Sequence, residues 1–461
     1  MLENVLEGKN ALFETGMQTV LRGQENRYRR IVVQNGNVVQ NARSEQNGVS
    51  ANVYKNGVNG FASIAEYTGA AAEQVLKAAT ENAQYLNKYT RNKKAALPGY
   101  HTGWTASKGI ILDIEQKKLV DMCMEIDTYI GKTYPKLSNR MVIYREDTME
   151  KIIYTSDACN GHVVYPRFAL YVVIGMESKE GEPLELTECF GGYGNINDNP
   201  VPMKEVQEKV ERLYKRICDK AEGVYAEAGV KTVILDSDVA GMIAHEAVGH
   251  TVEADLVLGG SVAASNLGKQ VASEKISIVD YAHTVGEEMA PLPVFLDDEG
   301  VEAKDAVLVE NGKLTGYMNN RETAGHFGVE PCGNARAREF SDEPLIRMRN
   351  TLVLPGNDKL EDMIASVDDG YYLMSTGNGQ ADLTGEFMFG INMGYEIKNG
   401  KLGRAIFDTT VSGVAFDMLK TCDMVADKIK WSPYGTCGKK QAMAVSMGGP
   451  AIKCQINIGG R

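Results

Sequence analysis

Hydrophobic and polar positions alternate along the first sixty residues, and four Asn-Gly pairs divide the alternating stretches. The stretches include residues 30–34 and 49–54, and the pairs are Asn35-Gly36, Asn47-Gly48, Asn56-Gly57 and Asn59-Gly60. Asn-Gly between two alternating stretches is a strong signal for a tight β-hairpin, because both residues tolerate a positive φ. The pattern therefore predicts an antiparallel meander in this part of the chain.

Helical spacing of apolar residues follows in three segments, which are residues 69–88, 114–130 and 202–228. Shorter extended stretches at residues 141–144, 151–154 and 169–175 are predicted as strands. The last helical segment carries many charges, and we expect it to separate two domains. The predicted domains are residues 1–228, with a further division near residues 100–130, and residues 229–461.

The second half of the chain begins with a buried strand at residues 233–235. Ser237 or Asp238 is expected to cap the helix that follows, since both residue types favour that position. Asn-Gly pairs return at positions 311, 378 and 399 and predict further hairpins. The predicted class is α+β in two lobes. An N-terminal α/β lobe has antiparallel hairpins, and a twisted antiparallel sheet dominates the C-terminal lobe and carries the helix.

Composition and charge narrow the function classes. The chain has 461 residues, 43% of them hydrophobic, and a formal net charge of −12. A broadly acidic surface repels phosphate backbones, so direct nucleic-acid binding is disfavoured. The longest apolar run, residues 168–176, is far shorter than a membrane span. We expect no secretory signal at residues 1–20, and the 8 cysteines form no Cys-x-x-Cys pair. These features predict a cytoplasmic protein with reduced thiols.

Two of the 6 histidines flank a glutamate in the sequence His245-Glu246-Ala-Val-Gly249-His250. Imidazoles bind zinc, and a carboxylate beside such an ion can accept a proton from water. The histidines are five residues apart, which places them roughly 140° around a regular α-helix from each other. They converge on one ion only if the helix opens locally into a π-type turn. Gly249, which lacks Cβ, is the expected place for that distortion.

Two other motifs are weaker. Gly268-Lys269 lacks the upstream glycine and the following serine or threonine of a phosphate-binding loop, so that motif is rejected. The acidic run at residues 297–299 is compatible with calcium binding, but a solvated turn is favoured.

Residues 243–255, which include the histidine pair, resemble the signature of the TldD/PmbA family of zinc peptidases, once described as modulators of DNA gyrase. Further blocks in the same order extend the resemblance over about residues 231–461, and a looser likeness covers residues 40–90. The blocks are residues 295–300, 333–336, 347–351, 385–389, 394–397 and 435–439.

The resemblance implies a zinc ion on His245, His250 and Cys437, with Glu246 as general base. It also implies the catalytic type of family member, which acts as a dimer with a second copy or with a paralogue that lacks the zinc motif. One departure is that Lys440-Gln441 stands where the family usually has a glycine before glutamine. The loop after Cys437 is therefore expected to be one residue short.

Four further residues are candidates for supporting roles. Glu253 and Asp255 lie just beyond the second histidine, and either one can orient a ligand imidazole or replace Cys437 on the metal. Asn334 and Arg336 lie in a glycine-flanked block and are candidates for gripping a peptide backbone, although a structural ion-pair role is equally expected.

The favoured function is an intracellular zinc peptidase for unfolded or extended peptides. The alternatives are a binding or regulatory subunit with a structural or vestigial metal, and a zinc hydrolase of other amides.

Overall fold

Four long antiparallel strands dominate the first part of the molecule. The computed structural model describes residues 2–91, 97, 105–109 and 113–459. The long strands are β1 (Gln18–Gln34), β2 (Asn37–Lys55), β5 (Asn139–Thr155) and β6 (Asn160–Glu177). They lie in the order β2-β1-β5-β6. The short stretches predicted at residues 141–144, 151–154 and 169–175 are thus pieces of two much longer strands.

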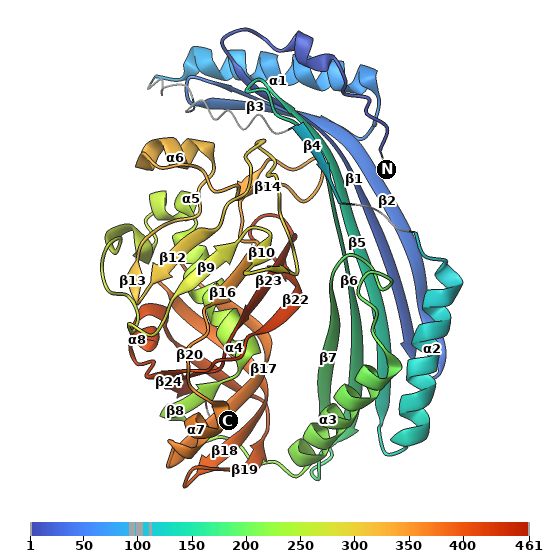
Figure 1. Ribbon diagram of the computed structural model, residues 1–461, viewed down its shortest axis with the longest axis vertical. Helices are drawn as coiled ribbons and strands as arrows, with labels where there is room; N and C mark the ends of the chain where they lie inside the picture. The colour runs from blue at the N-terminus through green and yellow to red at the C-terminus, as the bar shows by residue number, and fades with distance from the viewer. Residues whose placement is uncertain (1, 92–96, 98–104, 110–112, 460–461) are drawn as a thin grey trace.

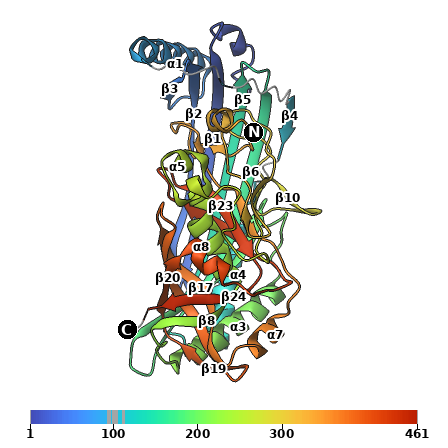
Figure 2. The ribbon, with the colours of Figure 1, turned by 90° about the vertical axis from the view of Figure 1, so that its left-hand side faces the viewer.

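Three shorter strands complete this sheet. They are β3 (Val58–Ile64) beside β2, β7 (Pro183–Tyr193) beside β6, and β4 (Thr105–Lys108), which pairs with β6 in parallel. Figure 1 shows the long strands running the height of the molecule past the C-terminal half. Figure 2, turned by 90°, shows that half in front of them.

Two of the four N-terminal Asn-Gly pairs form the predicted turns. Asn35-Gly36 joins β1 to β2 and Asn56-Gly57 joins β2 to β3, and all four residues have positive φ. The prediction was wrong for the other two pairs, which lie inside strands. At Gly60 the reason is close packing, because a Cβ would lie 2.2 Å from the carbonyl oxygen of Ala79 in the helix above.

Three helices confirm the predicted helical segments. They are α1 (Gly69–Tyr89), α2 (Gln116–Thr133) and α3 (Met203–Ala221), which ends before the predicted residue 228. Alternate β1 residues such as Leu21 and Ile31 face α1 and α2 in hydrophobic clusters. The intervening Arg22 and Gln24 point to the opposite face and bond to the C-terminal half. The two-residue period of the strand therefore separates a helix-covered face from an inter-lobe face.

The α+β class is confirmed, but the C-terminal half contains two main sheets rather than one. The first is a six-stranded sheet in the order β13-β12-β9-β16-β23-β22. Its strands are β13 (Lys313–Leu314), β12 (Ala306–Glu310), β9 (Ile278–Tyr281), β16 (Asn350–Val353), β23 (Met443–Gly449) and β22 (Lys430–Cys437). Its β16–β23 pair is parallel.

The second sheet runs β17-β8-β24-β20-β18-β19, and an additional β17–β18 pairing closes it into a barrel-like ring. Its strands are β17 (Asp369–Ala381), β8 (Gly229–Leu235), β24 (Ile452–Ile458), β20 (Thr409–Val414), β18 (Glu386–Lys398), β19 (Lys401–Ile406) and β21 (Met424–Val425), which pairs with β24. The predicted strand at residues 233–235 is the buried end of β8.

Of the three Asn-Gly pairs of this half, two form the predicted turns and one does not. Those at positions 311 and 399 form the β12–β13 and β18–β19 turns, as predicted. The pair at position 378 lies in β17 at a register shift opposite β18, so the predicted hairpin there was wrong.

Short strands and helices make up much of the rest of the C-terminal half. The small strands are β10 (Thr284–Val285), β11 (Glu288–Met289), β14 (Ala335–Arg336) and β15 (Leu345–Ile346). The helices are α4 (Ser237–Met242), α5 (Ala254–Leu258), α6 (Arg321–Phe327), α7 (Leu360–Ala365) and α8 (Ala415–Lys420). Within the described ranges, no helix combines the length and apolar character that a membrane span requires.

The domain boundary predicted at residue 228 stays a prediction, and so does the division near residues 100–130, part of which lies outside the described residues. Buried contacts join the two halves. Asp298 pairs with Arg22 of β1 at 3.0 Å and with Lys151 of β5 at 2.7 Å.

Candidate metal centre

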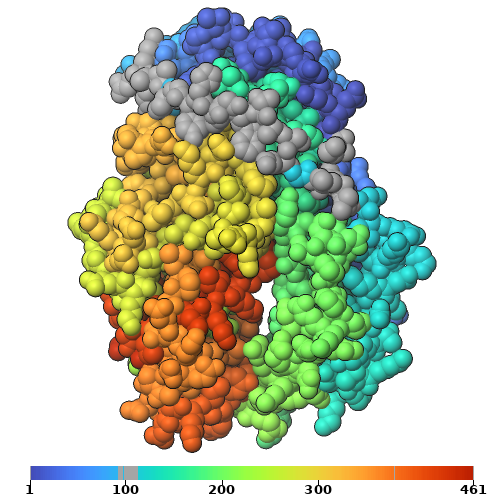
Figure 3. All heavy atoms as spheres, viewed as in Figure 1, coloured from blue at the N-terminus to red at the C-terminus, as the bar shows by residue number. Residues whose placement is uncertain are grey.

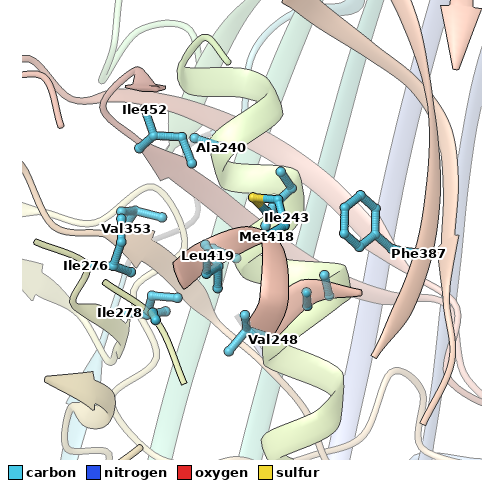
Figure 4. Packing of buried hydrophobic residues seen from close by; sticks show 14 of the residues in the cluster. Ala240, Ile243, Val248, Ile276, Ile278, Val353, Phe387, Met418, Leu419 and Ile452 are labelled. Atoms are coloured by element: carbon cyan, nitrogen blue, oxygen red, sulfur yellow. The ribbon is translucent and has the colours of Figure 1, made fainter. Parts of the chain in front are cut away.

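The histidine-bearing segment begins at a capped helix in the core of the C-terminal half. The side chain of Asp236 accepts the backbone N–H groups of Asp238 and Val239, both at 3.1 Å. Asp236 is thus the N-cap of α4, and the prediction of Ser237 or Asp238 was wrong by one or two positions. Figure 4 shows the apolar packing around this helix and its continuation.

The helix opens into a π-helical turn over Ile243–Gly249, as the five-residue spacing predicted. The backbone N–H of His250 donates to the carbonyl oxygen of His245, which is the wide hydrogen bond of such a turn. It brings the two imidazoles to one side, with ring centroids 5.4 Å apart.

Gly249 does not create the distortion, contrary to expectation. Its φ of −52° and ψ of −51° are ordinary right-handed helical values that any residue adopts. Packing favours glycine there, because a Cβ would lie 2.1 Å from the sulfur of the buried Met348, which would have to move.

Cys437 completes a group of three potential metal ligands. It ends β22, 187 residues after His250, and its Sγ lies 3.2 Å from His250 Nε2. One ligand atom from each of His245, His250 and Cys437 can be chosen so that all three lie within 4.8 Å of one another. The shortened loop therefore leaves Cys437 beside the histidines. Lys440 adopts a φ of 54°, in the left-handed region where a glycine would be unstrained.

The donor set fits a zinc ion. His245 is 1% exposed, and neither of its ring nitrogens makes a hydrogen bond to a described residue; its neighbours are the other two potential ligands, within 4.8 Å, and the Glu246 carboxylate, at 3.9 Å. A buried polar group without a partner is costly, and a metal would satisfy one of these nitrogens. Two imidazoles and a thiolate are ligands that zinc prefers, and three protein ligands leave a fourth position for water or substrate.

Electrostatics favours the thiolate form of Cys437. Burial alone would raise the pKa of this thiol, but the imidazoles of His245 and His250 lower it to about 3. Burial would likewise lower the pKa of His250, whereas Cys437 and Glu253 raise it. Both shifts favour a Cys437 thiolate beside the imidazoles, which is the form that binds a metal.

The motif carboxylate lies beside both imidazoles. Glu246 Oε1 is 3.9 Å from His245 Nε2, and Glu246 Oε2 is 3.6 Å from His250 Nε2. Its side chain is 22% exposed, so water reaches it. A carboxylate with this access, next to the ligand nitrogens, is placed to exchange protons with a reacting group.

Glu253 and Asp255 take different positions. Glu253 is fully buried, and its Oε2 lies 2.9 Å from His250 Nδ1, where it can orient the imidazole. Asp255 instead pairs with Lys439 at 2.7 Å and touches neither histidine.

The side chains of Asn334 and Arg336 are buried and form hydrogen bonds within the C-terminal half. The Asn334 amide donates to Asp280 at 2.9 Å, and Arg336 donates to the carbonyl oxygens of Met348 and Ala444 at 2.6 and 2.8 Å. These contacts support the structural role over the grip on a peptide.

Two cations that had no assigned role contact the loop after Cys437. Arg347 is fully buried and donates to the Cys437 carbonyl oxygen at 2.8 Å. Lys439 pairs with Glu253 at 3.1 Å as well as with Asp255. Both residues lie in family-like sequence blocks, which was the signal available for them.

The acidic run at residues 297–299 is not a solvated turn. Asp298 is 3% exposed and holds the ion pairs to Arg22 and Lys151. Asp297 accepts backbone N–H groups from Glu299, Val301 and Ala335. The predicted turn forms, but the C-terminal half buries it against the long sheet.

Comparison with known families identifies the class of protein. Residues 228–460 match the PmbA/TldA metallopeptidase C-terminal domain, and residues 20–83 match PmbA/TldA metallopeptidase domain 1. The chain belongs to the PmbA/TldD metallopeptidase family, as its sequence blocks indicated.

Curated relatives are named metalloproteases. A metalloprotease of Methanocaldococcus jannaschii is 32% identical over 463 residues, covering 97% of this chain and 98% of that protein. A zinc metalloprotease TldD homolog of Saccharolobus solfataricus is 30% identical and covers 79% of this chain and 80% of that one.

Solved structures share the fold. TldE from Thermococcus kodakarensis superposes with a TM-score of 0.78 at 16% identity, covering 99% of each chain. A Thermotoga maritima protein, described as a proposed modulator of a DNA gyrase, superposes with a TM-score of 0.77 at 19% identity, covering 99% of this chain and 98% of that one.

Proposed function

We propose that this protein is a zinc-dependent peptidase in which His245, His250 and Cys437 hold the metal and Glu246 is the general base. The observation that carries the proposal is the convergence of three ligand atoms within 4.8 Å, with the Glu246 carboxylate 3.6 and 3.9 Å from the two imidazoles. A purely structural site would need no carboxylate in that position.

The metal, Glu246 and Glu253 have different roles in the proposed reaction. Bound zinc would supply Lewis acidity, which polarises a peptide carbonyl and acidifies water. The Glu246 carboxylate accepts a proton from the attacking water and returns it to the leaving amine, so the peptide bond breaks without a free hydroxide or a charged amide leaving group. Glu253 keeps the His250 ring in its orientation.

Extended peptides are the proposed substrates. A cavity of about 440 Å³ is lined by residues of β7 and β22, including Glu188, Trp431 and Ser432. Among the described strands, each of these two pairs with a neighbour on one side only. A hollow between the C-terminal half and the β7–α3 region is visible in Figure 3. An extended chain that enters here can add to a strand edge through its backbone, with little demand on its side chains. β22 leads from this cavity to Cys437.

Metal analysis combined with cleavage of casein tests the proposal. We expect one zinc per chain, hydrolysis that stops on chelation and returns with zinc, and a Glu246→Gln variant that keeps its zinc but loses turnover. Glu287→Gln, which removes an exposed carboxylate far along the chain, is the matched control. Zinc binding without hydrolysis, and no difference between these two variants, would establish the binding-subunit alternative instead.

A dimeric assembly is also part of the proposal, either with a second copy or with a paralogue that lacks the histidine motif. Light scattering of the purified chain, alone and with such a paralogue, distinguishes the two. A monomer in both experiments contradicts this part.

A further inference from the structure

The two sides of the metal centre come from distant parts of the chain. His250 and Glu253 follow the π-turn, whereas Cys437 lies at the end of an edge strand and opens into a loop. A site built from two such elements binds metal well only if their separation is fixed beforehand, since ordering them on binding would cost free energy. The contacts between Glu253 and the loop after Cys437 therefore show how the separation of the two elements is fixed.

Lys439 makes those contacts. Its Nζ lies 3.1 Å from Glu253 Oε2, the same oxygen that is 2.9 Å from His250 Nδ1. The same Nζ donates to Asp255 at 2.7 Å and to the carbonyl oxygen of Ile346 at 3.1 Å. Its side chain is only 11% exposed. Desolvated, multiply bonded ion pairs hold geometry far better than exposed ones do.

The backbone around Lys439 is fixed from the other side. Arg347 donates to the carbonyl oxygens of Cys437, Lys439 and Gln441, at 2.8, 2.9 and 2.9 Å. Because this guanidinium holds the loop backbone, the position of the Lys439 ammonium is tied to that of Cys437, two residues before it. A chain of direct contacts thus runs from the Cys437 loop through Lys439 and Glu253 to His250.

We propose that Lys439 is a positioning residue of the metal centre, which holds Cys437 and His250 at the separation that one metal ion requires. The proposal rests on the proposed zinc site. In this role Lys439 makes no contact with substrate. The role requires only that its ammonium and the Glu253 carboxylate stay paired.

Three variants test it. Lys439→Met removes the ammonium but keeps most of the aliphatic stem. Lys440→Met removes the same charge one residue later, from an exposed side chain. Lys439→Arg keeps the charge. We expect zinc affinity, measured by competition with a chromogenic chelator, to fall roughly 10–100-fold in Lys439→Met, the usual effect of losing a partner of a ligand. Lys440→Met should bind as the wild type does, and Lys439→Arg should recover most of the loss.

A spectroscopic readout separates positioning from general stability. Cobalt substituted for zinc reports thiolate ligation through its charge-transfer absorption, and we expect this band to weaken in Lys439→Met but not in Lys440→Met. If Lys439→Met does not fold, Lys439→Gln, which keeps an N–H donor near Asp255, is the second variant, with the same expected loss. Wild-type affinity and an unchanged cobalt band in a folded Lys439 variant overturn the proposal, and so does an equal loss in Lys440→Met.

These readouts do not depend on hydrolysis. A wild-type chain that binds zinc but leaves casein intact overturns the proposed function alone, and the ranking of the variants still decides the role of Lys439. A wild-type chain that binds no zinc overturns both.

Discussion

Two of the buried clusters of ionisable groups in this molecule differ in how far the group at their centre is paired. Between the halves, Asp298 is surrounded by Arg22, Lys151 and the backbone N–H of Ala337, which donates at 2.8 Å. At the metal centre, His245 is just as buried but neither ring nitrogen has a partner in the described part of the chain.

This difference in pairing distinguishes a group that stabilises the fold from one that is available to bind a metal. Burying a polar group costs free energy unless it is paired, so the fold alone explains the Asp298 carboxylate, whose two oxygens both accept hydrogen bonds. His245 differs because both nitrogens of a metal-binding ring lack a hydrogen bond to any described residue, and a metal ion would complete one of them. The pKa of Asp298 is consistent with this pairing, because burial would raise it but Lys151 and Arg22 hold it below its usual value.

The largest predicted effect comes from breaking the paired cluster. Asp298→Asn leaves Arg22 and Lys151 buried without a counter-charge, and we expect the free energy of unfolding to fall by about 3–5 kcal/mol. Urea denaturation measures it. Asp417→Asn, at a carboxylate that is 76% exposed, is the control and should change stability by less than about 0.5 kcal/mol. A loss in Asp298→Asn as small as that of the control would show that the cluster is not structural.

Asp236 lies between these two cases, because it is buried and hydrogen-bonded but its pKa is raised. The prediction for it concerns how stability depends on pH. It is 8% exposed and bonds to two backbone N–H groups. Burial, with repulsion from Asp238, raises its pKa to about 7. Because the folded state holds this proton more tightly than the unfolded state does, the resulting stability is fully present below about pH 4 and is lost as pH rises towards 7.

Asp236→Asn keeps the cap but removes the titration. We therefore expect the variant to gain stability relative to the wild type between pH 4 and 8, by a few kcal/mol. Urea unfolding of both proteins across this range measures the difference, from which other titrating groups cancel. Parallel stability curves for the two proteins would contradict the pKa shift.

Local sequence patterns predicted only the local features of the site, whereas Cys437, 187 residues after His250, was predicted through the family resemblance alone. The spacing of His245 and His250 predicted the π-turn because that geometry depends on a single segment. The buried state of Asp298 was missed because its charged partners, Arg22 and Lys151, lie more than a hundred residues away, in the other half of the molecule. Lys439 was missed for the same reason, since Glu253 is 186 residues distant.

The fold, too, was predicted correctly where the signal is local and wrongly where it depends on a distant element. Helix periodicity located α1, α2 and α3, whereas Asn47-Gly48 and Asn59-Gly60 carried a turn signal in the middle of strands. At these positions the need for glycine comes from a neighbouring element, which no local pattern reveals.

Zinc should stabilise the folded protein only by binding at the metal centre. At a free concentration of 100 times its dissociation constant, a ligand that binds only the folded state adds about 2.7 kcal/mol. We expect this increment in urea titrations of the wild type and its loss in Cys437→Ser. A folded Asp298→Asn chain should keep it, since the two clusters share no residue. Equal stabilisation of the Cys437→Ser variant would place zinc elsewhere.

The smallest predicted effect concerns the helix between the ligands. Gly249→Ala forces a methyl group against the Met348 sulfur, which is itself buried, and we expect a loss of about 1–3 kcal/mol. Gly259→Ala is the control, because Gly259 is exposed and has helical angles, so alanine there should be neutral or slightly stabilising. If packing is the cause, adding Met348→Ala makes the double variant less unstable than the sum of the two single losses, because the removed side chain vacates the space. Additive losses would instead return the role of Gly249 to the backbone, and the π-turn would then depend on it.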